Sequence, residues 1–180
     1  VAIVLWWVAL LLWCFVMYAF FTAVVVRTEK PTLEKGINGA WLIATVATQS
    51  IAILSTLVSS EFSETQRVIL LFFALSMYLL GCMLYLNIIA LIFYRFTFIK
   101  FEPKDLTPTY WINMGAVAIT TLAGSTLMLN ASQWTFLEQI LIFIEGFTLF
   151  FWVAGTWWIP LLLLLGIWRH IIKRYPLRYD

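Results

Sequence analysis

The side chains that could do chemistry in this chain are hydroxyls and amides placed inside long apolar segments. In the segment 39–58, small or polar residues recur at every fourth position, which puts them on one face of a helix. Thr45 and Gln49 lie beside that stripe. Their hydroxyl and amide groups could form hydrogen bonds with a solute in a water-filled path. Close helix packing is the alternative, because small residues let helix backbones approach each other in a bilayer.

The segment 110–129 repeats this pattern, with Asn113, Ala116, Thr120 and Gly124 on one helical face. Asn113 lies near one end, where its side chain could reach interfacial water, and Thr120 could bond to a carbonyl of its own helix. No Lys or Arg lies centrally in an apolar segment, so an anion path would depend on hydroxyls, amides and helix ends. The residues predicted to line such a path are Thr45, Thr48, Gln49, Ala52, Asn113, Thr120 and Gly124.

Three further residues inside the apolar segments carry predictions of their own. Glu145 is an acidic residue within an apolar segment, and Glu138 precedes it on the same face. A buried Glu145 that exchanges protons could couple transport to pH, whereas a position at the outer headgroups would make it structural. Pro160 predicts a helix kink, because proline cannot donate to the preceding turn. Asn87 predicts a hydrogen bond between two helices.

The sequence predicts no catalytic site, no metal site and no cofactor. His170 is the one histidine, so two axial histidines cannot hold a haem here. Cys14 and Cys82 lie in separate apolar segments without metal-ligand spacing, and we expect small buried residues rather than a disulfide. There is no Ser/His/Asp set and no phosphate-binding glycine loop, so we do not expect an enzyme. The basic clusters flank the apolar segments, which argues against nucleic-acid binding.

Five apolar segments must position these side chains, at 1–26, 39–58, 68–94, 110–129 and 139–168. A helix of about 20 residues crosses a hydrocarbon core, and each segment has about that length or more. A hydrophobic fraction of 63%, a mean hydropathy of +0.96 and 11% charged residues exclude an ordinary soluble domain. We therefore predict an all-α, polytopic helical membrane protein, with residues 1–180 as a single transmembrane domain.

The five segments are not alike in composition. Leu, Ile, Val, Phe and Trp dominate 1–26, 68–94 and 139–168, whereas 39–58 and 110–129 are shorter and richer in Ala, Thr, Ser and Gly. This alternation predicts hairpins with one helix inside a bundle and one helix outside it. Helix starts are predicted at Asn38-Gly39, at Thr107-Pro108, and at two capping boxes, Ser63-x-x-Gln66 and Thr135-x-x-Glu138.

The basic residues lie at alternate connections. Of the eleven basic residues, the connections 59–67 and 130–138 contain only Arg67. The positive charge is therefore distributed very unevenly along the chain, although the net charge is only +2. The positive-inside rule then places residue 1 on the extracellular or periplasmic side and the C-terminal tail in the cytoplasm. We expect a multi-pass protein of the plasma membrane. The other basic residues are Arg27, Lys30, Lys35, Arg95, Lys100, Lys104, Arg169, Lys173, Arg174 and Arg178.

Two stretches resemble the tellurite-resistance/C4-dicarboxylate transporter family, which includes fungal malate permeases and the slow-type anion channels of plant guard cells. They are residues 34–50, EKGINGAWLIATVATQS, and 106–124, LTPTYWINMGAVAITTLAG. The resemblance implies a homotrimer of ten-helix protomers, each with five hairpins whose inner helices ring a central pore. It implies that this chain supplies helices four to eight, with 39–58 and 110–129 as inner helices. The family's aromatic gate lies on a later helix, so no gate residue is assigned.

The expected function is transport of small anions of the C4-dicarboxylate, sulfite, chloride or nitrate class through a pore lined by 39–58 and 110–129. The partners expected are these anions, the lipid bilayer and further copies of the chain. A proton-coupled dicarboxylate carrier and a non-transporting membrane scaffold subunit are the alternatives. Because the chain starts at Val1 inside an apolar run, we also expect it to be a piece of a longer protein.

Overall fold

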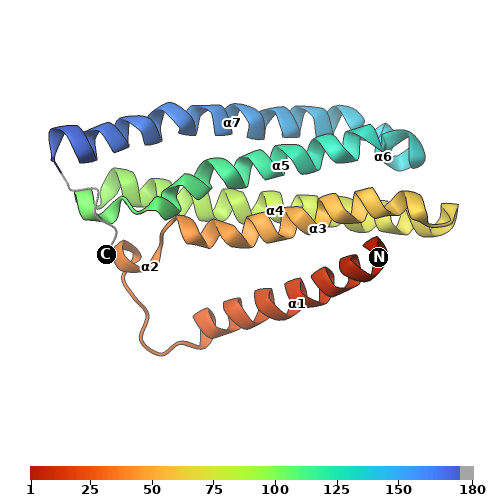
Figure 1. Cartoon of the computed structure of the whole chain (residues 1–180), viewed down its shortest axis with the longest axis horizontal. Coiled ribbons are helices and arrows are strands. Elements are labelled where there is room, and N and C mark those ends of the chain that lie inside the picture. Colours follow the sequence, from red (N-terminus) through yellow and green to blue (C-terminus); the bar gives the residue numbers. More distant parts are fainter. Residues whose placement is uncertain (175–180) are drawn as a thin grey trace.

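The structure, a computed structural model that describes residues 1–174, is a bundle of five long helices (Figure 1). They are α1 (Ala2–Val26), α3 (Ile43–Val58), α4 (Glu64–Phe98), α5 (Ile112–Leu129) and α7 (Leu141–Ile167). Together with adjoining helical turns, each is long and apolar enough to cross a membrane. The prediction of an all-α, polytopic helical membrane protein is confirmed.

Short elements connect the long helices. The helix α2 (Leu33–Gly36) follows α1, and α6 (Thr135–Gln139) precedes α7. Two 3₁₀ turns, Gly39–Leu42 and Pro108–Trp111, lead directly into α3 and α5. Further 3₁₀ turns lie at Ser59–Glu61, Pro103–Asp105 and Ala131–Gln133, and a π-helical turn at Trp168–Ile172 ends α7.

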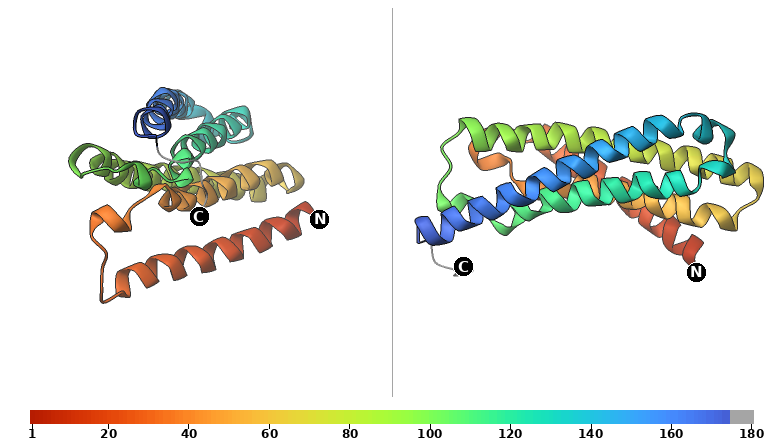
Figure 2. Two further views of the ribbon diagram at one scale, coloured as in Figure 1. Left: turned by 60° about the vertical axis from the view of Figure 1, so that its left-hand side comes forward. Right: turned by 90° about the horizontal axis from the view of Figure 1, so that it is seen from above.

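The helices form a layered arrangement in which α3 and α5 lie in front of α4, with α7 along one edge and α1 along the other (Figures 1 and 2). In the most apolar stretch of each helix, the fraction of residues that are buried is 61% for Gly39–Glu61, 50% for Glu64–Phe98 and 44% for Pro108–Leu129. It falls to 17% for Leu141–Ile172 and 6% for Ala2–Val26. The segments 39–58 and 110–129 are thus more buried than 1–26 and 139–168, and whether they are inner helices around a pore stays a prediction.

The expectation that all three Leu- and Phe-rich helices lie on the outside is wrong for α4. This helix backs both α3 and α5, and one of its faces carries small and hydroxyl-bearing residues that permit close packing. The residues on this buried face are Ala74, Tyr78, Gly81, Cys82 and Tyr85.

Three aromatic side chains of α1 contact α3 or the 3₁₀ turn that leads into it, at a constant register. Trp6 Nε1 donates to Ser55 Oγ at 2.8 Å, and Trp13 Nε1 donates to Thr48 Oγ1 at 3.0 Å. One heptad further on, the Phe20 ring lies 5.4 Å, centroid to centroid, from the ring of Trp41. The two helices run antiparallel, so every step of seven residues along α1 is matched by seven residues back along α3.

The predicted helix starts are partly correct. Ser63 and Gln66 form the capping box of α4, and the Asn38 side chain accepts from the Ala40 N–H at 2.9 Å. Thr107 precedes a 3₁₀ turn with Pro108 at its first position, but its hydroxyl bonds to Thr109 instead of to the backbone. The predicted box at Thr135 is wrong, because Thr135 is the first residue of α6 and Trp134 occupies the cap position.

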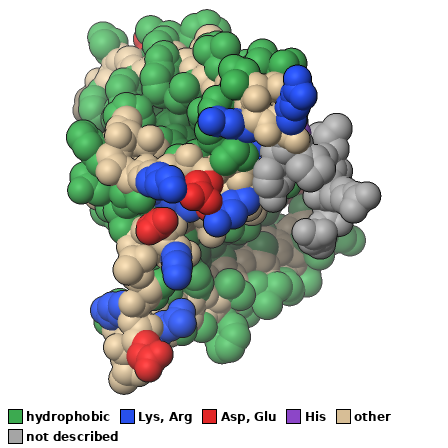
Figure 3. All heavy atoms as spheres, turned by 90° about the vertical axis from the view of Figure 1, so that its left-hand side faces the viewer, with side chains coloured by type: hydrophobic (Ala, Val, Ile, Leu, Met, Phe, Trp, Pro, Cys, Tyr) green, Lys and Arg blue, Asp and Glu red, His purple; other side chains and the backbone are tan. Residues whose placement is uncertain are grey.

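One end of the bundle, which we call the basic end, gathers Lys and Arg side chains (Figure 3). There Glu102 bonds to Lys104 Nζ at 2.9 Å and to Lys100 Nζ at 3.0 Å. The hydrogen bonds from Lys104 and then Lys100 lower the pKa of Glu102 from 4.5 to about 2. Arg178, which was counted with this group, lies outside the described residues. The described basic residues of this end are Arg27, Lys30, Lys35, Arg95, Lys100, Lys104, Arg169, Lys173 and Arg174.

Candidate functional site

The polar stripe of α3 is buried between helices. Thr45, Thr48 and Gln49 have no exposed surface, and Ala52 is 1% exposed. The Thr48 hydroxyl donates to the Ala44 carbonyl at 2.8 Å while it accepts from α1. This side of α3 therefore faces the neighbouring helices of the bundle.

Gln49 reaches α4 through a gap left by a glycine. Its Nε2 donates to the Tyr78 carbonyl at 3.2 Å and to Cys82 Sγ at 3.7 Å. A Cβ atom on Gly81 would lie 2.5 Å from Gln49 Nε2, so only glycine leaves room for the amide. The polar partner of the Gln49 amide is thus a backbone carbonyl of α4.

The polar stripe of α5 is also buried. Asn113 and Thr120 have no exposed surface, and Thr120 donates to the Ala116 carbonyl of its own helix at 2.7 Å. Gly124 packs where α4 and α7 meet α5, beside the hydrogen bond of 3.1 Å between the Tyr78 hydroxyl and Thr148 Oγ1. The structure therefore uses Thr120 and Gly124 in helix packing.

Three of the seven predicted residues keep polar atoms that bond to no described group. They are Thr45 through Oγ1, Gln49 through Oε1, and Asn113 through both Oδ1 and Nδ2. Buried polar atoms normally have a hydrogen-bond partner, and leaving one unpaired costs about 1–3 kcal/mol. These atoms are the ones in the stripe with capacity left for water or a solute. Whether the seven residues line a path stays a prediction.

The opposite face of α3 and α5 is open and also carries small residues. Ala47 and Ser50 are half-buried on α3, while Gly115 and Ala118 are exposed on α5. Large apolar side chains, among them Leu54, Leu57 and Leu122, are exposed on the same side. The exposed side chains of α1 and α7 are mostly Leu, Ile, Val, Phe and Trp, as is usual for surfaces that face lipid. We call this surface, Ala47, Ser50, Gly115, Ala118 and Ser125, the open small-residue face. Sequence periodicity showed that both helices hold small residues but not that they lie on two opposite faces.

The remaining predicted residues lie on the surface. Glu145 is exposed near the start of α7, so the described helices do not supply the burial that a proton-coupling role needs. Pro160 is exposed within α7, which continues as one helix through it. The prediction for Asn87 is wrong, because its Nδ2 donates to the Met83 carbonyl of its own helix at 3.0 Å. An exposed amide with no neighbouring helix bonds back to the nearest carbonyl.

Cys82 and Cys14 are free thiols, buried and half-buried respectively.

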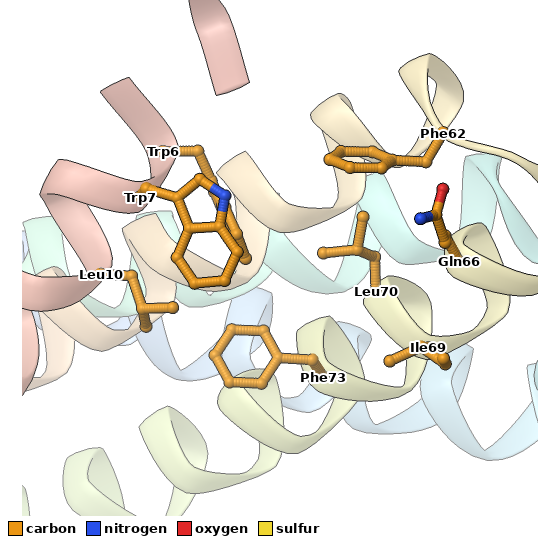
Figure 4. Close-up of a pocket in the computed structure, with 8 residues that line it drawn as sticks. All are labelled: Trp6, Trp7, Leu10, Phe62, Gln66, Ile69, Leu70 and Phe73. Carbon is orange, nitrogen blue, oxygen red and sulfur yellow. The ribbon is translucent and has the colours of Figure 1, made fainter. Parts of the chain in front are cut away.

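A cavity of about 340 Å³ lies at the end of the bundle opposite the basic end, between α1 and α4 (Figure 4). Apart from Gln66, its lining is apolar: Trp6, Trp7, Leu10, Phe62, Ile69, Leu70 and Phe73. It lies apart from the polar stripes and offers no charged group to an anion.

Comparison with known proteins identifies the family. Residues 1–179 match the voltage-dependent anion channel family, and the chain belongs to it, as the two resembling stretches indicated. An uncharacterized membrane protein of Mycobacterium tuberculosis is 38% identical over 99 residues, which are 54% of this chain and 49% of that protein. An uncharacterized transporter of Methanocaldococcus jannaschii is 25% identical over 143 residues, 79% of this chain and 40% of that protein.

The chain thus spans half or less of the length of the relatives it matches. No solved structure is significantly similar to it.

Proposed function

We propose that the full-length protein conducts small anions across the plasma membrane and that α3 and α5 supply part of the wall of the path. Membership of the anion channel family supports the class of function. The observation that carries the proposal is the set of buried, unpaired polar atoms on Thr45, Gln49 and Asn113. All three residues lie on the two long helices richest in small residues, which pack side by side at the front of the bundle.

The anion is of the C4-dicarboxylate, sulfite, chloride or nitrate class. Hydroxyls and amides bind such ions weakly, which suits rapid passage better than tight capture. The positive-inside rule supports placing the basic end in the cytoplasm. The family resemblance supports a homotrimer in which each protomer has its own path.

Anion flux into proteoliposomes tests the proposal. The full-length protein is reconstituted, and the fluxes of malate, sulfite, chloride and nitrate are compared with and without a proton gradient. Flux without a gradient supports a channel. Flux of dicarboxylates alone, driven by protons and altered by Glu145→Gln, supports a coupled carrier. A folded protein that passes no anion refutes the proposal and supports the scaffold alternative.

The role of the buried amide is tested with Gln49→Leu. The matched control is Gln139→Leu, which changes an exposed glutamine at the end of α6. We expect Gln49→Leu to alter anion flux or selectivity while the control leaves both unchanged. Equal flux and selectivity in both variants would remove Gln49 from the path.

Cysteine labelling decides which face of α3 and α5 meets the aqueous path. In a background with Cys14→Ala and Cys82→Ala, single cysteines replace Thr48 on the buried stripe or Ala47 on the open small-residue face. A charged, membrane-impermeant thiol reagent labels a position in contact with water. Labelling of Thr48→Cys alone supports the stripe as the path, and labelling of Ala47→Cys alone moves the path to the open face.

A further inference from the structure

Arg95 is a buried cation at the basic end, in the last turn of α4. Its residue surface is 7% exposed, so the guanidinium is nearly enclosed but not sealed. Nη1 donates to the Ile37 carbonyl at 2.7 Å and to the Tyr110 hydroxyl. Arg95 therefore touches both chain segments that lead into the inner helices α3 and α5.

The charge of Arg95 has no described counter-ion. Within residues 1–174 no ion pair of Arg95 is seen, and the nearby Glu102 pairs with Lys100 and Lys104 instead. Its hydrogen-bond acceptors are neutral groups, and the rings of Phe101 and Tyr110 lie 5.7 and 5.8 Å from the guanidinium carbon. Cation–π contacts offset part of the cost of burial, but a buried charge is normally paired with an opposite one.

The unused side of the guanidinium has the geometry that an oxyanion needs. Arginine carries N–H donors on Nη1, Nη2 and Nε in a planar fork. In the described residues only Nη1 makes hydrogen bonds, which leaves Nε and Nη2 without a protein acceptor. Two parallel donors on one edge can bind the two oxygens of a carboxylate-like group at the same time. A spherical halide has no second acceptor atom to match the second donor, so it fits this edge less well.

Some of the surroundings of Arg95 favour negative charge, although the Asp105 carboxylate acts on the same tyrosine, Tyr110, and Arg95 lies at the partially negative C-terminal end of α4. The turns that start the inner helices touch each other, because a Cβ atom on Gly39 would overlap the Thr109 carbonyl and lie 2.8 Å from Tyr110 Cα. Two helix starts next to each other add their partial positive charges. In the first turn of α5, the buried Asn113 amide still has both of its polar atoms unpaired.

We propose that Arg95 is an oxyanion-binding residue at the basic end of the path. It takes a carboxylate, nitrate or sulfite group on Nε and Nη2 while Nη1 stays bonded to Ile37 and Tyr110. The proposal deepens the proposed function and rests on it in one respect, that the bound anion is the one transported. The competing explanation is that Arg95 only clamps the starts of α3 and α5 together.

Ligand-dependent thermal stability separates these two roles without requiring transport. The full-length protein in detergent is heated with increasing sodium acetate or sodium nitrate, and with sodium chloride at the same ionic strength. A ligand that binds the folded state raises the midpoint in proportion to its occupancy. We expect acetate and nitrate to raise it well above chloride.

The variants are Arg95→Gln, Arg95→Lys and Tyr110→Phe. The matched control is Arg67→Gln, because Arg67 also donates to backbone carbonyls but lies at the opposite end of the bundle. We expect Arg95→Gln to weaken acetate binding by at least about tenfold. Arg95→Lys keeps the positive charge but loses the planar pair of N–H donors, so it should weaken acetate binding by a smaller factor. Arg67→Gln should leave acetate affinity unchanged. Tyr110→Phe removes one of the two bonds that hold Nη1, so it should lower the midpoint without ligand and weaken acetate binding by a smaller factor than Arg95→Gln.

Two results would overturn the proposal. Equal acetate affinity in Arg95→Gln and the unaltered protein would leave Arg95 as a clamp, and an equal response to chloride would remove the preference for oxyanions. The flux assay keeps this outcome separate from the proposed function. Flux that persists with no Arg95-dependent binding refutes only the binding site, whereas Arg95-dependent binding in a protein without flux refutes only transport.

Discussion

Adding one methyl group at Gly124 should destabilise the bundle far more than adding one elsewhere on the same helix. The Cβ atom of Gly124→Ala would overlap Thr148 Oγ1 and lie 3.0 Å from the Tyr78 hydroxyl. Overpacking of a buried contact costs about 1–3 kcal/mol. The Thr148 side chain must rotate away and lose its bond to Tyr78, which adds about 0.5–1.5 kcal/mol. Alanine's higher helix propensity offsets about 1 kcal/mol of this cost, so we expect a net loss of about 0.5–3.5 kcal/mol.

The matched control is Gly115→Ala, whose Cβ would have no atom within 4 Å. The substitution therefore only raises the helix propensity at this position, and it should be neutral or stabilise the protein by up to about 1 kcal/mol. Unfolding free energies are measured by titrating the micelle-bound protein with sodium dodecyl sulfate and recording helicity by circular dichroism. Because the propensity gain is common to both, the two alanine variants should differ by about 1.5–4.5 kcal/mol.

A second substitution tests the assigned cause. Thr148→Ala removes the oxygen that the new methyl group would strike, so Gly124→Ala should cost much less in that background. The resulting coupling between the two sites should be at least about 1 kcal/mol, as is usual for residues in contact. Equal stability of Gly124→Ala and Gly115→Ala, or strict additivity with Thr148→Ala, would show that α4, α5 and α7 do not meet at this point.

Two further predictions concern α1 and the basic end. Trp13→Phe keeps an aromatic ring but loses the bond to Thr48, so unfolding in the same titration should be easier by about 1 kcal/mol; an unchanged value would mean that the bond does not form in the micelle. Glu102 has a lowered pKa, so its ion pairs stabilise the connection after α4 fully above pH 4.5, and the effect is lost as pH falls toward about 2. Carbon-13 NMR of labelled glutamate side chains, with Glu102→Gln to assign the signal, should give a midpoint near 2; a midpoint near 4.5 would exclude persistent ion pairs.

Composition and spacing were sufficient to predict the five long helices and the burial of two of them, α3 and α5. Small residues let helix backbones approach each other closely, so their abundance in 39–58 and 110–129 indicated packed helices before any contact was known. The same argument missed α4, because its small residues lie on one face and are outnumbered by Leu and Phe on the other.

The partners of single side chains were beyond sequence reasoning. The partner of the Gln49 amide depends on the gap at Gly81, in a helix about thirty residues away, and loop lengths alone do not set that contact. Arg95 was counted with the other basic residues as a marker of orientation. Its burial depends on how the rings of Phe101 and Tyr110 fold back over it, which no local pattern encodes.

The even spacing of contacts between α1 and α3 has a consequence for how the first hairpin assembles in a membrane. A slide of α1 by one residue removes the three pairings of Trp6, Trp13 and Phe20 together, since each side chain turns by 100° away from its partner. Only a shift of α1 by seven residues would restore any of these contacts, and it would still leave one aromatic ring without a partner on α3. The hairpin thus has a single best alignment with no close competitor. Changes in the length of the connection at 27–38 should be tolerated, whereas one residue inserted within α1 should not.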